Sequence, residues 1–228
     1  MHQGRQTGVL AVVEGLLCGG TLTLTHLGRS LRGTGHTKHK IKRIDRLLGN
    51  THLHGECQQM YTALAGWLLE GTQRPVIVVD WSDCEPGHEW LMLTAALTVD
   101  GRALPVYQEV HRLSAYNSPG THRRFLQALH AVVPRQCRPI LVTDVGFRGP
   151  WFRAVEQLGW DWIGRVRNRI KVQVEGTDSW RYTTAIYREA TRRVRYLGRC
   201  ALSHKHPYTA HLYLVHLSRR GRPLKAHG

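Results

Sequence analysis

The sequence predicts a mixed α/β (α+β) domain built on one mixed sheet, with a small all-helical domain before it. Segments 75–80 and 138–144 each run through consecutive apolar residues into an aspartate. Strands that are apolar on both faces belong in the middle of a sheet. A helical pattern lies between the two segments, whereas the apolar residues before residue 74 recur at helical spacing throughout.

We expect four N-terminal helices. The first spans residues 9–17 and is stopped by the glycines that follow it. The second is short, with Thr25 as its expected N-cap and Leu31 near its end. The last spans residues 55–69, and its inward face should carry Met60, Leu64 and Leu68.

The remaining N-terminal helix, at residues 38–48, is basic and amphipathic. Its apolar stripe consists of Ile41, Ile44, Leu47 and Leu48. The other faces carry Lys38, Lys40, Lys42, Arg43 and Arg46. Short helices followed by a basic helix favour a helix-turn-helix-like module that binds DNA through these five residues. The alternative is a solvated basic face on an ordinary helix.

Net charge restricts the partners of the chain. With 32 Lys and Arg against 16 Asp and Glu, the formal charge is +16. Such an excess favours nucleic acid as partner, and an anionic membrane surface less strongly. No apolar run approaches the roughly 20 residues of a membrane helix, and the N-terminus lacks an apolar signal sequence. Five widely spaced cysteines indicate reduced thiols in a cytosol.

The segment after residue 74 predicts the order strand, strand, strand, helix, strand, helix, strand. Asp100-Gly101 is a hairpin signal, so the first three strands should form a meander. The fourth strand follows a helical crossover and should therefore run parallel to the first, as its possible neighbour. We expect strands at 75–80, 90–99, 103–110, 138–144 and 160–166, and helices that begin at Thr121 and Pro150.

Asp80 and Asp144 would then end neighbouring strands at the same edge of the sheet. Two carboxylates that close repel each other unless a cation lies between them. Oxygen ligands of this kind suit Mg²⁺ or Mn²⁺. The sequence thus predicts a metal site formed by Asp80 and Asp144. The alternative is that each aspartate only caps the turn that follows it.

Other polar residues are weaker candidates. Two groups of histidine and cysteine lack the spacing of zinc sites and are interpreted as surface residues: His52, His54 and Cys57, and His204, His206 and His211. Asp83 and Glu85 are expected to be solvated, and Trp81 and Trp151 to pack in the core. Three arginines alternate on one strand face near the site and are expected to contact phosphate: Arg165, Arg167 and Arg169.

Several strings resemble the DDE transposases of bacterial insertion sequences, in the insertion-sequence-four branch that includes the transposon-ten transposase. The resemblance extends in order over essentially the whole chain. The strings are Thr21–Arg29, Lys38–Asn50, Val79–Asp83, Thr143–Phe147, Pro150–Phe152 and Trp160–Arg167. It implies a ribonuclease-H-like core at 74–170, a helical domain at 1–73 that binds DNA ends, and the start of a β-rich insertion at 171–228.

The resemblance also implies an activity. Asp80 and Asp144 match the first two acids of the catalytic triad, which holds two Mg²⁺ (or Mn²⁺) ions. A cut-and-paste transposase of this kind binds terminal inverted repeats, cleaves them and joins them to target DNA. The implied form is a homodimer on two paired ends, in the cytoplasm of a bacterium and associated with the nucleoid.

The third acid of that triad has no match. In this branch it lies on a late helix in a Tyr-x-x-Arg-x-x-x-Glu-x-x-x-x-x-x-Lys signature, and Tyr187-Arg188-Glu189 does not fit that spacing. We therefore expect a truncated chain that lacks the catalytic glutamate. The alternative is a non-catalytic DNA-binding fragment that inhibits the full-length enzyme. A different metal-dependent phosphotransferase is disfavoured by the hairpin between the two acid-bearing strands.

Overall fold

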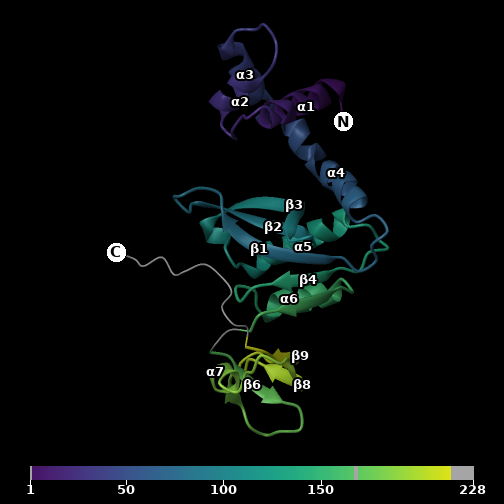
Figure 1. The fold of residues 1–228 in the computed structure, drawn as a ribbon, viewed down its shortest axis with the longest axis vertical. Coiled ribbons are helices and arrows are strands. Elements are labelled where there is room, and N and C mark those ends of the chain that lie inside the picture. Colours follow the sequence, from purple (N-terminus) through teal and green to yellow (C-terminus); the bar gives the residue numbers. More distant parts are fainter. Residues whose placement is uncertain (1, 167–168, 217–228) are drawn as a thin grey trace.

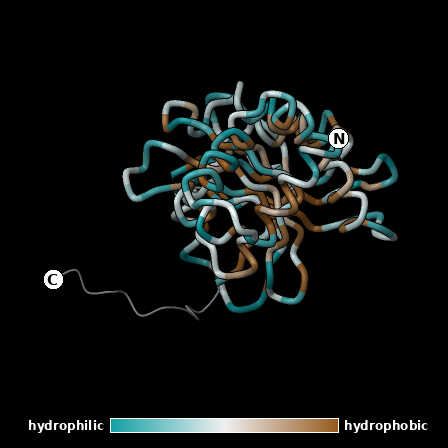
Figure 2. Tube along the Cα trace, turned by 90° about the horizontal axis from the view of Figure 1, so that it is seen from above, coloured by the Kyte–Doolittle hydropathy of each residue, from teal (hydrophilic) through white to brown (hydrophobic). Residues whose placement is uncertain are grey.

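The computed structural model describes residues 2–166 and 169–216. Figure 1 shows three parts along the long axis of the molecule: a group of short helices, a central sheet with helices, and a second small sheet. The long helix α4 connects the first part to the second. Seen from above, hydrophobic segments gather toward the middle of the chain trace (Figure 2).

The N-terminal part contains α1 (Gln3–Leu17), α2 (Leu24–Ser30), α3 (Thr37–Leu48) and α4 (Thr51–Leu68). Its small core is formed by Leu27, Leu31 and Ile44. Helices α2 and α3 cross closely: a Cβ atom on Gly28 would lie only 2.7 Å from the Cα of Ile41. The absence of a side chain at this position therefore allows the two helices to pack.

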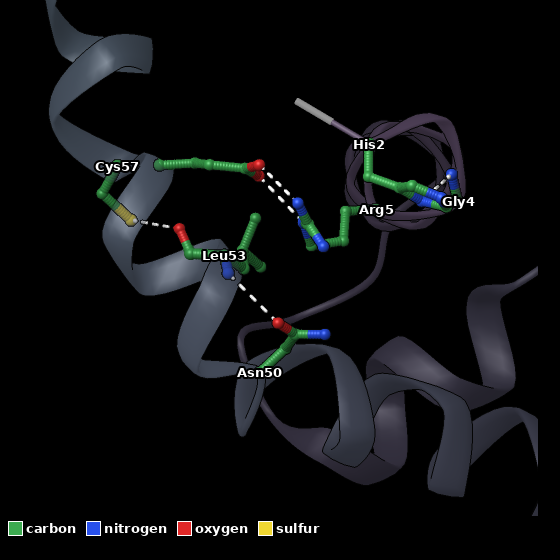
Figure 3. Close-up of polar contacts among 7 residues, drawn as sticks. His2, Gly4, Arg5, Asn50, Leu53 and Cys57 are labelled. Atoms are coloured by element: carbon green, nitrogen blue, oxygen red, sulfur yellow. Dashed lines mark hydrogen bonds and ion pairs between the residues drawn. The ribbon is translucent and has the colours of Figure 1, made fainter.

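Helix starts differ from the predicted ones. Helix α1 begins at Gln3, six residues before the expected start, and His2 accepts from the amide of Gly4 as its cap (Figure 3). Thr23, rather than Thr25, caps α2, because its hydroxyl accepts from the amide of His26. Asn50 caps α4 by accepting from the amide of Leu53, so this helix begins at Thr51, four residues before the predicted start.

Helix α4 is tied to α1 at one end and packs on the central sheet at the other. Arg5 donates two hydrogen bonds to Glu56, and the hydrogen bonds from Arg5 lower the pKa of that carboxyl group. Figure 3 shows Arg5 reaching from α1 towards α4. Toward the sheet, α4 presents Tyr61 and Ala65, followed by its C-cap Leu69. The prediction that Leu64 faces inward is wrong, because its side chain is exposed.

The central sheet has the strand order β3-β2-β1-β4-β5. Strand β1 pairs antiparallel with β2 and parallel with β4, which confirms the predicted mixed sheet and the adjacency of the two acid-bearing strands. The predicted hairpin turn is present, with positive φ at Asp100 and Gly101. The strands are β1 (Val76–Asp83), β2 (Trp90–Val99), β3 (Arg102–Arg112), β4 (Ile140–Thr143) and β5 (Asp161–Gly164).

Helices α5 (Pro119–Val132) and α6 (Gly149–Gln157) cover one face of this sheet. The short 3-10 turn η1 (Leu113–Ala115) precedes α5. Ser118 caps α5, not Thr121 as predicted, because Pro119 occupies the first turn and Thr121 donates its amide to the Ser118 hydroxyl. The shared core includes Ile77, Val79, Leu93, Phe125, Leu129, Leu141, Trp151 and Val155.

A second sheet of order β7-β6-β8-β9 follows the central one. Its elements are β6 (Lys171–Val174), β7 (Arg181–Tyr182), α7 (Thr183–Tyr187), β8 (Arg195–Leu202) and β9 (Tyr208–Leu214). The ring of Tyr208 stacks on Phe152 of α6 at a centroid distance of 5.9 Å. This contact joins the second sheet to the covered side of the central one.

All five cysteines are free thiols, as expected for a chain without a disulfide framework. Within the ranges 2–166 and 169–216, the helices are too short or too polar to cross a membrane.

Candidate active site

Asp80 and Asp144 lie side by side at one edge of the central sheet. The parallel ladder between β1 and β4 ends with the pair Val79–Thr143, and each aspartate is the next residue. Strand β1 itself continues to Asp83, paired there with β2 alone, so Asp80 does not end its strand as predicted. Both residues reach solvent, although the Asp80 side chain is partly buried.

Backbone amides orient both carboxylates. One oxygen of Asp80 accepts from the amide of Trp81 at 2.8 Å. One oxygen of Asp144 accepts from the amide of Gly146 at 2.7 Å. A Cβ atom on Gly146 would lie 2.9 Å from that same Asp144 oxygen, so glycine lets the carboxylate fold back onto the loop. These contacts use one oxygen of each side chain.

The two acids interact electrostatically. Partial burial raises the pKa of Asp80 and the negative charge of Asp144 raises it further, while the hydrogen bond from Trp81 opposes both effects. A cation between the carboxylates would relieve this repulsion. The donors are carboxylate oxygens alone, which is the chemistry that Mg²⁺ and Mn²⁺ prefer. The two residues therefore fit a divalent cation.

No third acid joins this pair in the described part of the chain. Residues 2–166 and 169–216 contain no group of three or more His, Cys, Asp or Glu side chains able to hold a metal ion. Asp83 instead pairs with His88 at 2.8 Å, and Asp161 pairs with Arg74 at 2.7 Å. The two sets of histidine and cysteine, at residues 52–57 and 204–211, form no such group among these residues.

Arg165 lies at the same sheet edge as the two aspartates. Its backbone amide donates to the carbonyl oxygen of Thr143, the residue before Asp144. Its side chain and that of Arg169 are exposed. Arg167 lies outside the described residues. The structure thus brings at least one of the three arginines next to the strand that bears Asp144.

Helix α3, which carries the basic residues, lies in the N-terminal group of helices, away from the central sheet that carries the acid pair (Figure 1). Lys38, Lys42, Arg43 and Arg46 are exposed, opposite the buried Ile44. Lys40 is different, because it is half-buried and its ammonium group donates to the carbonyl oxygen of Leu31 at the end of α2. Lys40 thereby stabilises the α2–α3 arrangement.

Sequence reasoning missed His122, which is buried among the aromatic residues that surround the acid pair. Its Nε2 atom accepts from the indole of Trp81, and its ring stacks on Phe147. Trp81 and Trp151 pack in this cluster, as predicted. Helical spacing could have revealed His122, since it precedes the inward residues Phe125 and Leu129 by three and seven positions.

Asn117 is a second residue that sequence reasoning missed, and no pattern in the sequence indicates it. Its backbone has a positive φ of 55°, and its buried side-chain oxygen has no hydrogen-bond partner among the described residues. That oxygen would lie 3.6 Å from a Cβ atom on Gly146. Asn117 therefore approaches the loop that orients Asp144.

The fold and the site define a basic, mixed α/β protein with two acids on neighbouring parallel strands. A family model described as a transposase DDE domain matches residues 71–222, which is more than half of the chain. The chain therefore belongs to the DDE-domain transposase family, whose members transfer phosphoryl groups on DNA and generally use divalent metal ions. No curated protein and no solved structure matches the chain.

Proposed function

We propose that Asp80 and Asp144 are the first two metal ligands of a cut-and-paste transposase in the insertion-sequence-four branch. The observation that carries this proposal is their position directly after the paired residues Val79 and Thr143. Residues 74–170 would form a ribonuclease-H-like core. Two Mg²⁺ (or Mn²⁺) ions would be held there when the site is complete.

The bound ions would activate a water or a 3′-hydroxyl and stabilise the leaving oxygen of the DNA phosphodiester. The residues of this chain supply the negative charge and the geometry. The amides of Trp81 and Gly146 each hold one carboxylate oxygen, which leaves the other available for a cation. Arg165 would contact the DNA phosphate beside Asp144, together with Arg167 and Arg169.

The helical segment 1–73 would bind the terminal inverted repeats. Its exposed cations, Lys38, Lys42, Arg43 and Arg46, form one face of α3, and a basic helix of this kind can enter the major groove or contact the backbone. The active form would be a homodimer on two paired ends. One DNA segment would contact both α3 and the acid pair, with α3 in the N-terminal group of helices and the pair on the central sheet.

A third carboxylate would be needed for catalysis, and none joins the pair within the part of the chain that the structure describes. Strand alternation places Val78, Val142 and Ile163 on the sheet face opposite α5 and α6. Among the described residues, this face exposes Ile163 by 59% and Val110 by 55%. It is the same face on which Asp80 lies, and a further helix could cover it.

Cleavage of DNA that carries the inverted repeats flanking the gene tests this proposal. A catalytic chain cuts at the repeat ends only with Mg²⁺ or Mn²⁺ present, and Asp80→Ala or Asp144→Ala abolishes the cut. Asp83→Ala is the matched control, because Asp83 lies on the same strand but pairs with His88. Undiminished cleavage by either of the first two variants would remove the metal role.

The second candidate is a DNA-binding chain without catalytic activity, which inhibits the complete enzyme by occupying transposon ends. The lack of a third acid beside the pair, within the part of the chain that the structure describes, favours it. It predicts a gel shift on inverted-repeat DNA without cleavage. Equal affinity for random duplex of the same length would contradict it, whatever the salt dependence of binding.

A further inference from the structure

His122 contacts both segments that carry the acid pair. On one side, the indole nitrogen of Trp81 donates to Nε2 of His122 at 3.2 Å, and Trp81 directly follows Asp80. On the other side, the His122 ring stacks on Phe147 with a centroid distance of 4.9 Å and an interplanar angle of 20°. Phe147 lies three residues after Asp144. The imidazole therefore lies between the two segments.

The segments that His122 contacts also donate the backbone hydrogen bonds to the two carboxylates. The residue that donates its indole to His122 also donates its backbone amide to Asp80. The residue before Phe147 is Gly146, whose amide holds Asp144. A displacement of Trp81 or Phe147 would therefore shift the amides that orient the two acids.

The His122 ring is well held in this position. It is 6% exposed and lies edge-on to Trp151 at 5.3 Å. Burial, with a smaller contribution from His111, lowers the pKa of His122 to about 4, so the ring is neutral near pH 7. Since Nε2 accepts from Trp81, the ring proton belongs on Nδ1. Protonation of Nε2 would remove the acceptor.

We propose that His122 is a positioning residue, which sets the separation of the Asp80 and Asp144 carboxylates by holding the Trp81 and Phe147 segments together. This inference rests on the proposed metal-binding role of the two acids. It assigns to the first turn of α5 a function in the site, although α5 contributes no ligand.

Two tryptophans in the same cluster provide a matched test. Trp81→Phe removes the indole donor and retains an aromatic ring. Trp151→Phe makes the same chemical change next to the same histidine, but the indole nitrogen of Trp151 has no hydrogen-bond partner among the described residues. A third variant, His122→Gln, keeps a side-chain oxygen that can accept from Trp81.

The readout is the dissociation constant for Mn²⁺, measured by calorimetry on the full 228-residue chain without DNA. We expect about a tenfold weaker affinity in Trp81→Phe, as is usual when a group that orients metal ligands is lost. Trp151→Phe should match the wild type, and His122→Gln should lie between the two. Melting temperatures measured alongside show whether each variant is folded.

Two failures are distinguishable. If Mn²⁺ binds the wild type and Asp80→Asn equally, or binds neither, the acids are not a metal site and the proposed function falls together with this inference. If Asp80→Asn loses Mn²⁺ but folded Trp81→Phe binds it as the wild type does, the role of His122 alone is overturned. Equal weakening in Trp81→Phe and Trp151→Phe would also overturn it, because loss of packing would then suffice.

Discussion

Val79 of β1 and Thr143 of β4 form the last pair of the parallel ladder in the central sheet. Each is buried, and each is followed by an exposed aspartate. The alternation of a strand explains this change from buried to exposed. The register of two buried strands thus places two carboxylates together, at an edge where ligands of α/β folds commonly bind.

Removing one charge of the pair should change the titration of the other. Because the charge of Asp144 contributes to the raised pKa of Asp80, Asp144→Asn should lower the pKa of Asp80 towards its ordinary value. Carbon-detected NMR titration of the Asp80 carboxyl group measures this shift. Asp83→Asn is the control and should leave the titration almost unchanged. An identical Asp80 pKa in wild type and Asp144→Asn would show that the acids do not interact.

The crossing of α2 and α3 should not tolerate a side chain at Gly28. A Cβ atom there would meet the backbone nitrogen of Ile41 at 2.8 Å, so Gly28→Ala forces the helices apart. We expect a loss of about 1–3 kcal/mol in the free energy of unfolding, measured with urea.

Gly55 is the matched control for that substitution, since it lies in α4 and a Cβ atom added to it would meet nothing within 4 Å among the described residues. Gly55→Ala should be neutral or stabilising, by up to about 1 kcal/mol, because alanine favours a helix. Equal stability of the two variants would contradict the close packing of α2 on α3.

The buried His122 ring should make the fold sensitive to acid. Burial lowers the pKa of His122 from 6.5 to about 4. Between these values the unfolded chain binds a proton that the folded chain does not, so stability falls as the pH drops below 6.5. The loss should reach about 3 kcal/mol near pH 4 and be absent above pH 6.5.

Urea denaturation at pH 7 and pH 4.5 checks this dependence in the wild type and in His122→Gln, which cannot titrate at this position. The wild type should lose more stability than the variant between the two pH values. If the difference in unfolding free energy between the two proteins is the same at both pH values, His122 is not the group responsible for the acid sensitivity.

Two basic residues of α3 should behave differently on substitution. Arg46 is exposed, so Arg46→Ala should weaken DNA binding and reduce the salt slope of log K by about 0.9, as for one lost phosphate contact. Lys40 donates to the carbonyl of Leu31, so Lys40→Ala should mainly lower stability. Fluorescence anisotropy at several salt concentrations and urea denaturation separate the two effects. If Lys40→Ala weakens DNA binding and Arg46→Ala instead lowers stability, Lys40 is the residue that faces DNA.

Much of the sheet topology could be predicted because short sequence patterns determine it. A helical crossover between 75–80 and 138–144 requires parallel strands, and the Asp100-Gly101 turn requires a hairpin. The N-cap of α5 could not be predicted in this way, because Ser118 and Thr121 are both favourable capping residues. In the structure the helix begins at Pro119, so Ser118 is the cap.

The surroundings of the acid pair were harder to predict because they depend on tertiary contacts. His122, Trp81 and Phe147 are separated by 41 and 25 residues in sequence and meet only when α5 packs on the sheet. The left-handed backbone of Asn117 is likewise set by the chain on both sides of it. Helical spacing indicates that His122 faces inward, but no pattern in the sequence indicates its partners or the conformation of Asn117.

The central claim is that Asp80 and Asp144 together hold a divalent cation. Its most direct test is the paramagnetic broadening of assigned backbone amide NMR signals by substoichiometric Mn²⁺. The claim predicts that the signals of Trp81 and Gly146 broaden first, and that Asp80→Asn or Asp144→Asn abolishes this effect. Broadening centred on the histidines at 204, 206 and 211, with Trp81 and Gly146 unaffected, would contradict it.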